Sequence, residues 1–278
     1  MALIEHILRE TIQSPVFLTA VAAILALEHF FPADPEQKVF STGFFHDLLW
    51  LLLALAFTGS VLVVYTELLR TFYDRHLGFL TVKPMTQLPE AVRILLGILL
   101  ADFLAWFQHW LKHKIPWFWQ IHTVHHSQRQ MNLFTDLRFH YLEYIISKPI
   151  VLLPLLMLSV ETPNIVGFGL ISTWQTRFYH ANIRTHLGPL RYLFVTPQSH
   201  RIHHSIEPRH FDKNFGVMFS FWDRIFRTHY AGFQEYPKTG VKNPSFPLEK
   251  SSGLAGHLQT AANQMLYPFL FPWRRREE

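Results

Sequence analysis

Long uncharged stretches alternate with polar, proline-containing segments along the chain. Residues 11–27 and 48–66 carry no charged side chain. Residues 94–111 carry one charge, that of Asp102, and a fourth apolar region covers residues 141–176, divided by an acidic residue and a Thr-Pro-Asn turn. Stretches of this length are close to what a helix needs to cross a bilayer. The pattern predicts an integral, multi-pass membrane protein with about four to five spans or helical hairpins.

Strand signals are sparse, and helix-forming residues dominate the apolar segments, so we expect an all-α bundle. A large soluble helical core is the alternative, and spans of this length disfavour it. We expect three regions: membrane helices with an interfacial segment in residues 1–90, a histidine-rich catalytic domain in residues 91–250, and a C-terminal tail in residues 251–278. The first apolar stretch lacks a basic flank and a small-residue cleavage site, so we expect it to be retained.

Composition and charge support a membrane and suggest an orientation. The chain is 49% hydrophobic and 16% charged, with a net charge of +5. Of its 25 Lys and Arg residues, six precede residue 112 and nineteen lie from there onward. We expect the polar, histidine-rich segments to form a helical cap on the membrane bundle, and the positive-inside rule places this cap on the cytoplasmic side. The membrane would be the inner membrane of a bacterium or the endoplasmic reticulum of a eukaryote. We interpret the basic balance as membrane contact, with no nucleic-acid partner. Four basic residues in residues 70–93 conflict with a simple zigzag, so we expect Tyr65–Pro89 to lie along an interface.

Histidines recur at helical spacing in three short sequence motifs, or words. HxxxH covers His109 and His113, and HxxHH occurs twice, at residues 122–126 and 200–204. Spacings of three and four residues put each set on one helix face. Eighteen histidines in 278 residues would produce one HxxHH word by chance about 0.1 times. Asp102 lies two turns before His109, where a buried carboxylate could hold the second N–H of a ligand imidazole.

These words predict a metal site without thiolate ligands, because the chain has no cysteine. Eight imidazoles exceed what one tetrahedral or octahedral ion takes, so two ions fit the count. At the cytosolic end of membrane helices, such a site has lipid as its natural substrate. Two rival functions remain: a haem-binding membrane electron carrier, which would not need HxxHH twice, and a divalent-metal transporter, whose ligands would lie near the bilayer midplane.

The same words resemble the histidine boxes of the fatty acid hydroxylase and sterol desaturase superfamily. The resemblance extends over residues 102–226. It is carried, in family order, by DFLAWFQHWLKH, FWQIHTVHHS, LRFHYLE, HANI, VTPQSHRIHHS, NFG and WDRIF. It implies a membrane-bound non-haem di-iron monooxygenase that hydroxylates or desaturates C–H bonds of a lipid, with O₂ as co-substrate. Sterols, acyl chains, ether lipids and lipid headgroups all remain possible substrates.

The resemblance also implies a ligand set. Asn182 would act through a water molecule, and His180 is preferred over His186 as the ninth ligand. His140 is expected to orient the site. Zinc is expected to replace iron on overexpression. Without cysteines or a GxGxxG fingerprint, electrons must come from a separate ferredoxin, cytochrome or flavoprotein reductase. The implied metal ligands are His109, His113, His122, His125, His126, His180, His200, His203 and His204.

Overall fold

The architecture is all-helical, as the sequence predicts. A computed structural model describes residues 15–160, 162–249 and 253–270. Within these ranges there is no strand, and extended pairing is limited to three isolated β-bridges. The α-helices are α2 (Pro15–Phe30), α3 (Thr42–Phe57), α4 (Val63–Phe72), α5 (Glu90–Lys114), α6 (Pro116–His126), α7 (Tyr141–Met157), α8 (Thr162–His180), α9 (Pro197–His203), α10 (Phe221–Ile225) and α11 (Gly253–Leu270). Short π-helical and 3₁₀ turns occupy Thr58–Leu62, Tyr73–Leu77, Gly78–Leu80, Lys83–Gln87, Thr135–Leu137, Gly188–Tyr192 and Pro208–His210.

Helices α3 and α4 form one helical run through two π-helical turns. This run, Thr42–Leu80, has 39 residues, and among the described helices it alone is long and apolar enough to cross a membrane. Only 24% of its most apolar window is buried inside the protein. The part of Tyr65–Pro89 up to Leu80 therefore continues the helix that begins at Thr42, and its position along an interface stays a prediction. No proline interrupts the run before Pro84, and proline is the residue that most strongly stops a helix.

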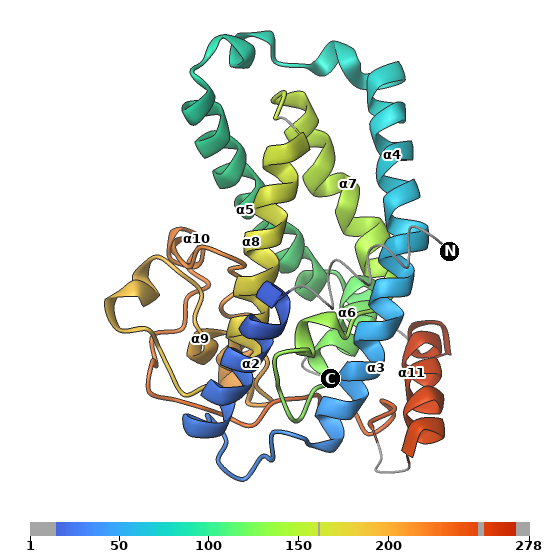
Figure 1. Ribbon diagram of the computed structural model, residues 1–278, viewed down its shortest axis with the longest axis vertical. Helices are drawn as coiled ribbons and strands as arrows, with labels where there is room; N and C mark the ends of the chain where they lie inside the picture. The colour runs from blue at the N-terminus through green and yellow to red at the C-terminus, as the bar shows by residue number, and fades with distance from the viewer. Residues whose placement is uncertain (1–14, 161, 250–252, 271–278) are drawn as a thin grey trace.

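The fourth apolar region folds back on itself, as predicted. Helices α7 and α8 run in opposite directions, joined by a turn in which Ser159 adopts a positive φ of 53°. Figure 1 shows α4, α7, α8 and the first part of α5 in the upper half of the molecule, and α6, α9 and α11 in the lower half. Helix α2 is a shorter apolar helix, so the count of four to five spans stays a prediction.

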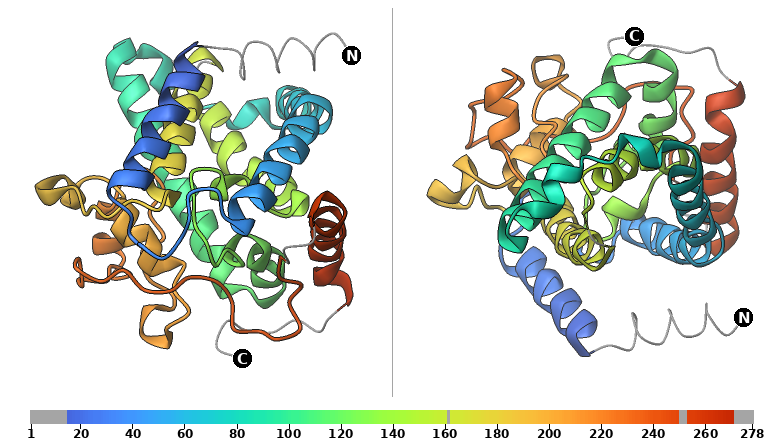
Figure 2. Two further views of the ribbon diagram at one scale, coloured as in Figure 1. Left: turned by 60° about the horizontal axis from the view of Figure 1, so that its bottom comes forward. Right: turned by 90° about the horizontal axis from the view of Figure 1, so that it is seen from above.

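The lower half of the molecule contains the buried core. One apolar cluster joins Ile24 of α2 and Phe44 of α3 to Leu133 and Ile183 in loops. A second joins Trp50 and Val124 to Ala261 and Tyr267 on α11, together with Phe246. Figure 2 shows α11 along the side of the molecule next to α3. The segment predicted as a C-terminal tail therefore includes a packed helix, while residues 271–278 lie outside the described part of the chain.

Candidate metal centre

Nine histidines that lie far apart in the sequence meet in the lower half of the molecule. All nine are buried, with exposed fractions of 8% or less. They divide into two groups, and within each group the ligand nitrogens lie within 4.8 Å of one another. The first group comprises His109, His113, His122, His126 and His203, and the second comprises His125, His180, His200 and His204.

The two groups adjoin, because each HxxHH word contributes to both. On α6, the i and i+4 histidines join the first group, while His125 joins the second. On α9, the division is reversed, since His203 alone joins the first group. His126 and His204 stack across the boundary with their ring centroids 4.3 Å apart. The geometry is that of two neighbouring histidine groups that share two helices, each of which could hold an ion.

Local sequence explains where α9 begins. Thr196 is the N-cap, and its hydroxyl accepts from the Ser199 N–H. The Ser199 hydroxyl in turn accepts from the backbone N–H of Thr196. Pro197 occupies the first turn, where its missing N–H costs nothing. A threonine cap followed by proline is a typical helix start, and α9 begins there. It places His200 and His204 one turn apart on one face.

Hydrogen bonds fix the tautomer of several of these imidazoles. His109 Nδ1 lies 2.9 Å from Phe215 O, and His125 Nδ1 lies 3.1 Å from Arg138 O. His180 Nδ1 lies 2.8 Å from Thr176 O, and His203 Nδ1 lies 2.8 Å from Lys213 O. A carbonyl oxygen only accepts, so Nδ1 carries the proton and Nε2 presents a lone pair. This outer arrangement is typical of histidines that bind metal through Nε2.

Spacing between the Nε2 atoms tests whether a metal fits the second group. The Nε2 atoms of His125 and His180 lie 3.2 Å apart, although both present lone pairs. The Nε2 of His200 lies 2.8 Å from that of His180 and 3.0 Å from that of His204. Two nitrogens about 2.1 Å from one ion lie roughly 3.0–3.4 Å apart at tetrahedral or octahedral angles. Facing lone pairs repel without a cation and become favourable around one, so the residues fit a metal.

Burial keeps these histidines neutral. Removal from water, followed by the effect of neighbouring imidazoles, lowers the pKa of His125, His200 and His204 well below the usual value near 6.5. Neutral imidazole is the form that binds metal. These three imidazoles are therefore in their ligand form at neutral pH.

One carboxylate next to the histidines was not singled out from the sequence. Glu143, on α7, accepts the His122 Nδ1–H at 2.9 Å through Oε2. Its Oε1 forms an ion pair with Lys112 Nζ at 2.8 Å. Both partners are almost fully buried. The LRFHYLE word contains Glu143, but only the packing of α5, α6 and α7 brings it to the imidazole.

Asp102 does not fill the role expected for it. Its carboxylate accepts from the backbone N–H groups of Met218 and Phe219, at 2.8 and 3.0 Å, and from the indole of Trp222 at 2.9 Å. These donors all belong to the segment that contains α10. Asp102 therefore connects α5 to the segment around α10, and it does not hold a ligand imidazole as expected. Glu143 and backbone carbonyls hold the imidazoles instead.

Asn182 also points to a structural role. Its Oδ1 accepts from Asp34 N at 2.9 Å and from Arg201 Nη1 at 3.3 Å, and its Nδ2 donates to Asp34 O at 3.1 Å. These contacts join the chain after α2 to the chain after α8. These bonds use the polar atoms of the side chain for which the family resemblance implied contact with a metal-bound water.

Two other histidines lie outside both groups. His186 accepts from Gly188 N through Nδ1 and packs against Phe233. His140 caps α7 by accepting from Leu142 N, and its Nε2 bonds to Met265 O on α11. His186 therefore does not replace His180 in the second group.

A buried ion-pair network supports the centre from the side of α3 and the C-terminal segment. Arg138 is fully buried and pairs with Asp47 at 2.6 Å and with Glu249 at 3.2 Å. The backbone carbonyl of Arg138 is the acceptor for His125. Asp47 and Glu249 thus position a metal-group histidine through the Arg138 backbone.

Comparison with known proteins identifies relatives of this chain. A sequence model of the family described as fatty acid hydroxylase matches residues 94–228. The ornithine lipid hydroxylase OlsE of Rhizobium tropici is 24% identical over 258 residues, which cover 91% of this chain and 74% of the relative. The sphingolipid C4-hydroxylase SUR2 of Saccharomyces cerevisiae is 26% identical over 243 residues, 84% of this chain and 60% of the relative.

A third relative matches a shorter part of the chain. Human alkylglycerol monooxygenase is 32% identical over 131 residues, which cover 47% of this chain and 29% of the relative. The chain thus spans about three quarters of the Rhizobium relative but less than a third of the human one. No solved structure gives a significant match to this chain.

Proposed function

Since the chain belongs to the fatty acid hydroxylase family, we propose that it is a membrane-bound, non-haem di-iron monooxygenase that hydroxylates a lipid with O₂ and external electrons. The observation that carries the proposal is the division of nine buried histidines into two adjoining groups. Five and four imidazoles match the coordination numbers of two ions better than that of one.

In this proposal the two histidine groups each hold one iron ion. A bound iron pair would supply the activation of O₂ that an unactivated C–H bond requires. The protein supplies the rest. Backbone carbonyls hold the Nδ1 protons of His109, His125, His180 and His203, so the Nε2 atoms stay basic and aimed inward. Glu143, charged beside Lys112, does the same for His122.

Burial of the histidines keeps water away from the centre. The ring of Phe215, which is fully buried, packs on His109, His113 and His203 at centroid distances of 5.8, 5.0 and 5.6 Å. An apolar wall of this kind limits side reactions with solvent.

Hydroxylation is favoured over desaturation by the names of the relatives. OlsE and SUR2 are both hydroxylases, of ornithine lipid and of sphingolipid, and the human relative is a monooxygenase. Their substrates differ, and what they share is a lipid with a polar head. The separate electron donor follows from the absence of cysteine, which leaves no ligands for an iron–sulfur cluster in this chain.

Membrane placement in this proposal follows the shape of the molecule. The upper half, with α4, α7, α8 and the first part of α5, would lie in the bilayer, and the histidines would lie at its cytoplasmic surface (Figure 1). Exposed Val64, Leu68 and Phe72 on α4, and Leu170 and Ile171 on α8, suit contact with lipid tails.

Comparative lipid mass spectrometry tests the function. Cells that express the chain should contain a lipid heavier by one oxygen atom that is missing from cells without the gene. The same product should be missing from cells that express His200→Ala at equal protein level. Identical lipid profiles in all three strains, with the protein present and iron-loaded, would exclude lipid hydroxylation.

A further inference from the structure

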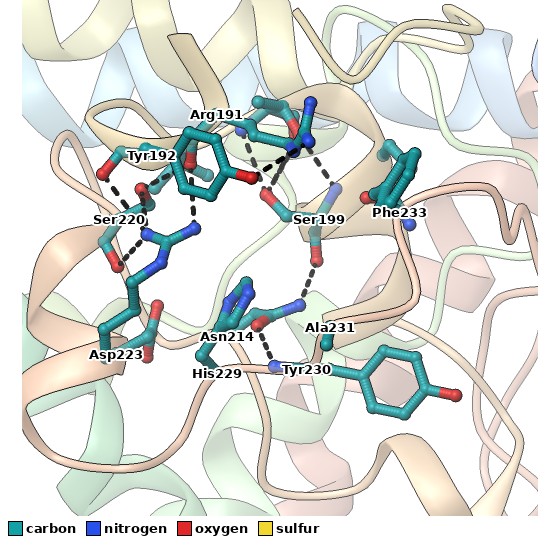
Figure 3. A pocket seen from close by; sticks show the side chains of 14 residues that line it. Arg191, Tyr192, Ser199, Asn214, Ser220, Asp223, His229, Tyr230, Ala231 and Phe233 are labelled. Carbon is teal, nitrogen blue, oxygen red and sulfur yellow. Dashed lines mark hydrogen bonds between the residues drawn. The ribbon is translucent and has the colours of Figure 1, made fainter. Parts of the chain in front are cut away.

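A cavity of about 180 Å³ lies beside α9, next to the metal centre but outside both histidine groups. Thr196, Gln198 and Ser199 of the α9 start form one wall. Arg191 and Tyr192, the α10 region, and residues 229–231 and 233 form the others (Figure 3). Because Ser199 precedes His200 in the chain, a group bound here lies close to the centre.

Two arginines line this cavity without a carboxylate partner among the described residues. Arg191 donates from Nη1 to Gly188 O at 2.7 Å and from Nη2 to the Tyr192 hydroxyl at 3.1 Å. Arg224 donates to the carbonyls of Tyr192, Ser220 and Arg191 and to the Ser220 hydroxyl. All these acceptors are neutral, and neither arginine forms an ion pair with a described residue, although the Asp223 charge acts on Arg224 at longer range. A guanidinium has five N–H donors, and Arg191 uses two of them in these bonds.

Aromatic rings hold the two guanidinium groups close together. The Cζ atoms of Arg191 and Arg224 lie 4.7 and 5.1 Å from the centroid of the same Tyr192 ring. Arg191 also lies 4.5 Å from the Phe233 centroid. Figure 3 shows Arg191, Tyr192 and Phe233 along one side of the cavity. Two like charges on one ring repel each other, and a bound anion removes that repulsion while it gains charge-assisted hydrogen bonds.

The one acidic side chain in the cavity wall is already committed elsewhere. Asp223 accepts from the backbone N–H groups of Phe215 and Gly216, from the Trp106 indole and from the Thr228 hydroxyl. These four donors, one on α5 and three in the loops that flank α10, stabilise its negative charge. Asp223 therefore does not serve as the counterion of Arg191.

The surroundings indicate a lipid source for the anion. Leu190 and Leu193 lie on either side of Arg191 and Tyr192, and Ile225 and Phe226 follow Arg224. All four are exposed large apolar side chains. The Phe226 ring stacks on Trp106 of α5 with centroids 4.4 Å apart. In Figure 1, α10 lies beside α5 near the middle of the long axis, where the upper helices meet the lower half. Arginines within an apolar rim are typical of a surface that meets lipid headgroups.

We propose that this cavity binds the phosphate or carboxylate of an acidic membrane lipid through Arg191 and Arg224. The position beside α9 makes this lipid the substrate, a statement that rests on the proposed hydroxylase function. The headgroup is held at the arginines, and its chain or adjoining carbon atoms extend toward the histidines. The site thus selects acidic lipids over zwitterionic ones.

Calorimetric titration of the detergent-purified chain tests the binding site without any need for turnover. The probes are dihexanoylphosphatidylglycerol, dihexanoylphosphatidylcholine and inorganic phosphate. We expect the acidic lipid to bind at least about tenfold more tightly than either of the other two. Arg191→Gln should weaken acidic-lipid binding by about tenfold, which is the scale of one charged hydrogen bond.

Arg209→Gln is the matched control, because it removes the same charge from an exposed arginine that pairs with Glu207 and Glu235. It should bind like the unaltered chain. Arg191→Gln is preferred to Arg224→Gln, which could disturb four loop contacts, and a thermal unfolding curve checks that the variant is folded.

Equal binding of the two lipids, or unaltered binding by folded Arg191→Gln, would overturn the site. Phosphate bound as tightly as the acidic lipid would overturn the lipid assignment. Acidic-lipid binding by a chain that oxidises no lipid in cells would instead count against the proposed function and leave the site standing.

Discussion

His122 on α6 donates its Nδ1–H to the carboxylate of Glu143 on α7, and the two atoms lie 2.9 Å apart. The residues are separated by 21 positions in the sequence, and both are buried. Lys112 on α5 forms an ion pair with the same carboxylate. Three helices thus meet at one carboxylate that orients a histidine of the first group.

Replacement of Glu143 should weaken metal binding. Glu143→Ala removes the acceptor for His122 and leaves Lys112 buried without its counterion, so we expect a 10- to 100-fold loss of metal affinity. Glu143→Gln keeps an acceptor oxygen and should lose less. Competition with a chromogenic chelator measures the affinity. Glu36→Ala, at an exposed acidic position, serves as the control, and full metal affinity in Glu143→Ala would contradict the positioning role.

The division of the histidines predicts the metal count. Gently purified protein should contain about two ions per chain, and iron or zinc can fill the sites because imidazole ligands suit both. His109→Ala alters only the first group and His204→Ala only the second, so each should retain about one ion. Elemental analysis decides the point. One ion per chain in an active preparation of the unaltered protein would reject the two-ion centre.

The two candidate histidines of the HANIRTH segment should behave differently. His180 has its Nε2 within 3.2 Å of two other group members, so His180→Ala should lower metal content and abolish turnover. His186 packs on Phe233 outside both groups, so His186→Ala should keep most of both. Metal content and product formation are measured side by side. Loss of metal in His186→Ala as complete as in His200→Ala would mean that the ligand set is misassigned.

Asp102 should matter for stability more than for metal. Asp102→Asn places an amide N–H₂ against three donors, which should lower the free energy of unfolding by about 1–3 kcal/mol. The folded fraction should keep its metal, because no histidine bonds to Asp102 among the described residues. Thermal unfolding and elemental analysis give the two readouts. Metal loss at unchanged stability would restore the role that the sequence suggested.

Cysteine labelling tests the orientation, since the chain has no native cysteine to interfere. Arg75 is exposed near the end of the α3–α4 run, and Lys238 is exposed near α9. If the histidines face the cytoplasm, Lys238→Cys should react with an impermeant thiol reagent only in opened membranes. Arg75→Cys, at the opposite end of the helices, should react in intact cells. The reverse pattern would invert the proposed topology.

Sequence patterns anticipated much of the local structure because those signals are short-range. The apolar runs predicted helices, and the division of residues 141–176 predicted the reversal between α7 and α8, although the Thr-Pro-Asn residues themselves begin α8 and do not form the turn. Thr196 and Pro197 are a typical helix start, and α9 begins there. Spacings of four residues correctly placed His109 beside His113. Each of these depends on backbone periodicity or capping, which residues a few positions apart determine.

Tertiary structure alone decided how the histidines are shared and what holds them. Periodicity puts His122, His125 and His126 on one face, but only the approach of α5, α8 and α9 assigns His125 to a different group from its neighbours. Buried polar groups take whichever partner the packing brings within reach, and sequence spacing does not encode that distance. Asp102 therefore bonds to the α10 segment, and Glu143 meets His122. The sequence determined which residues could bind metal, and the packing of the helices determined which of them share an ion site.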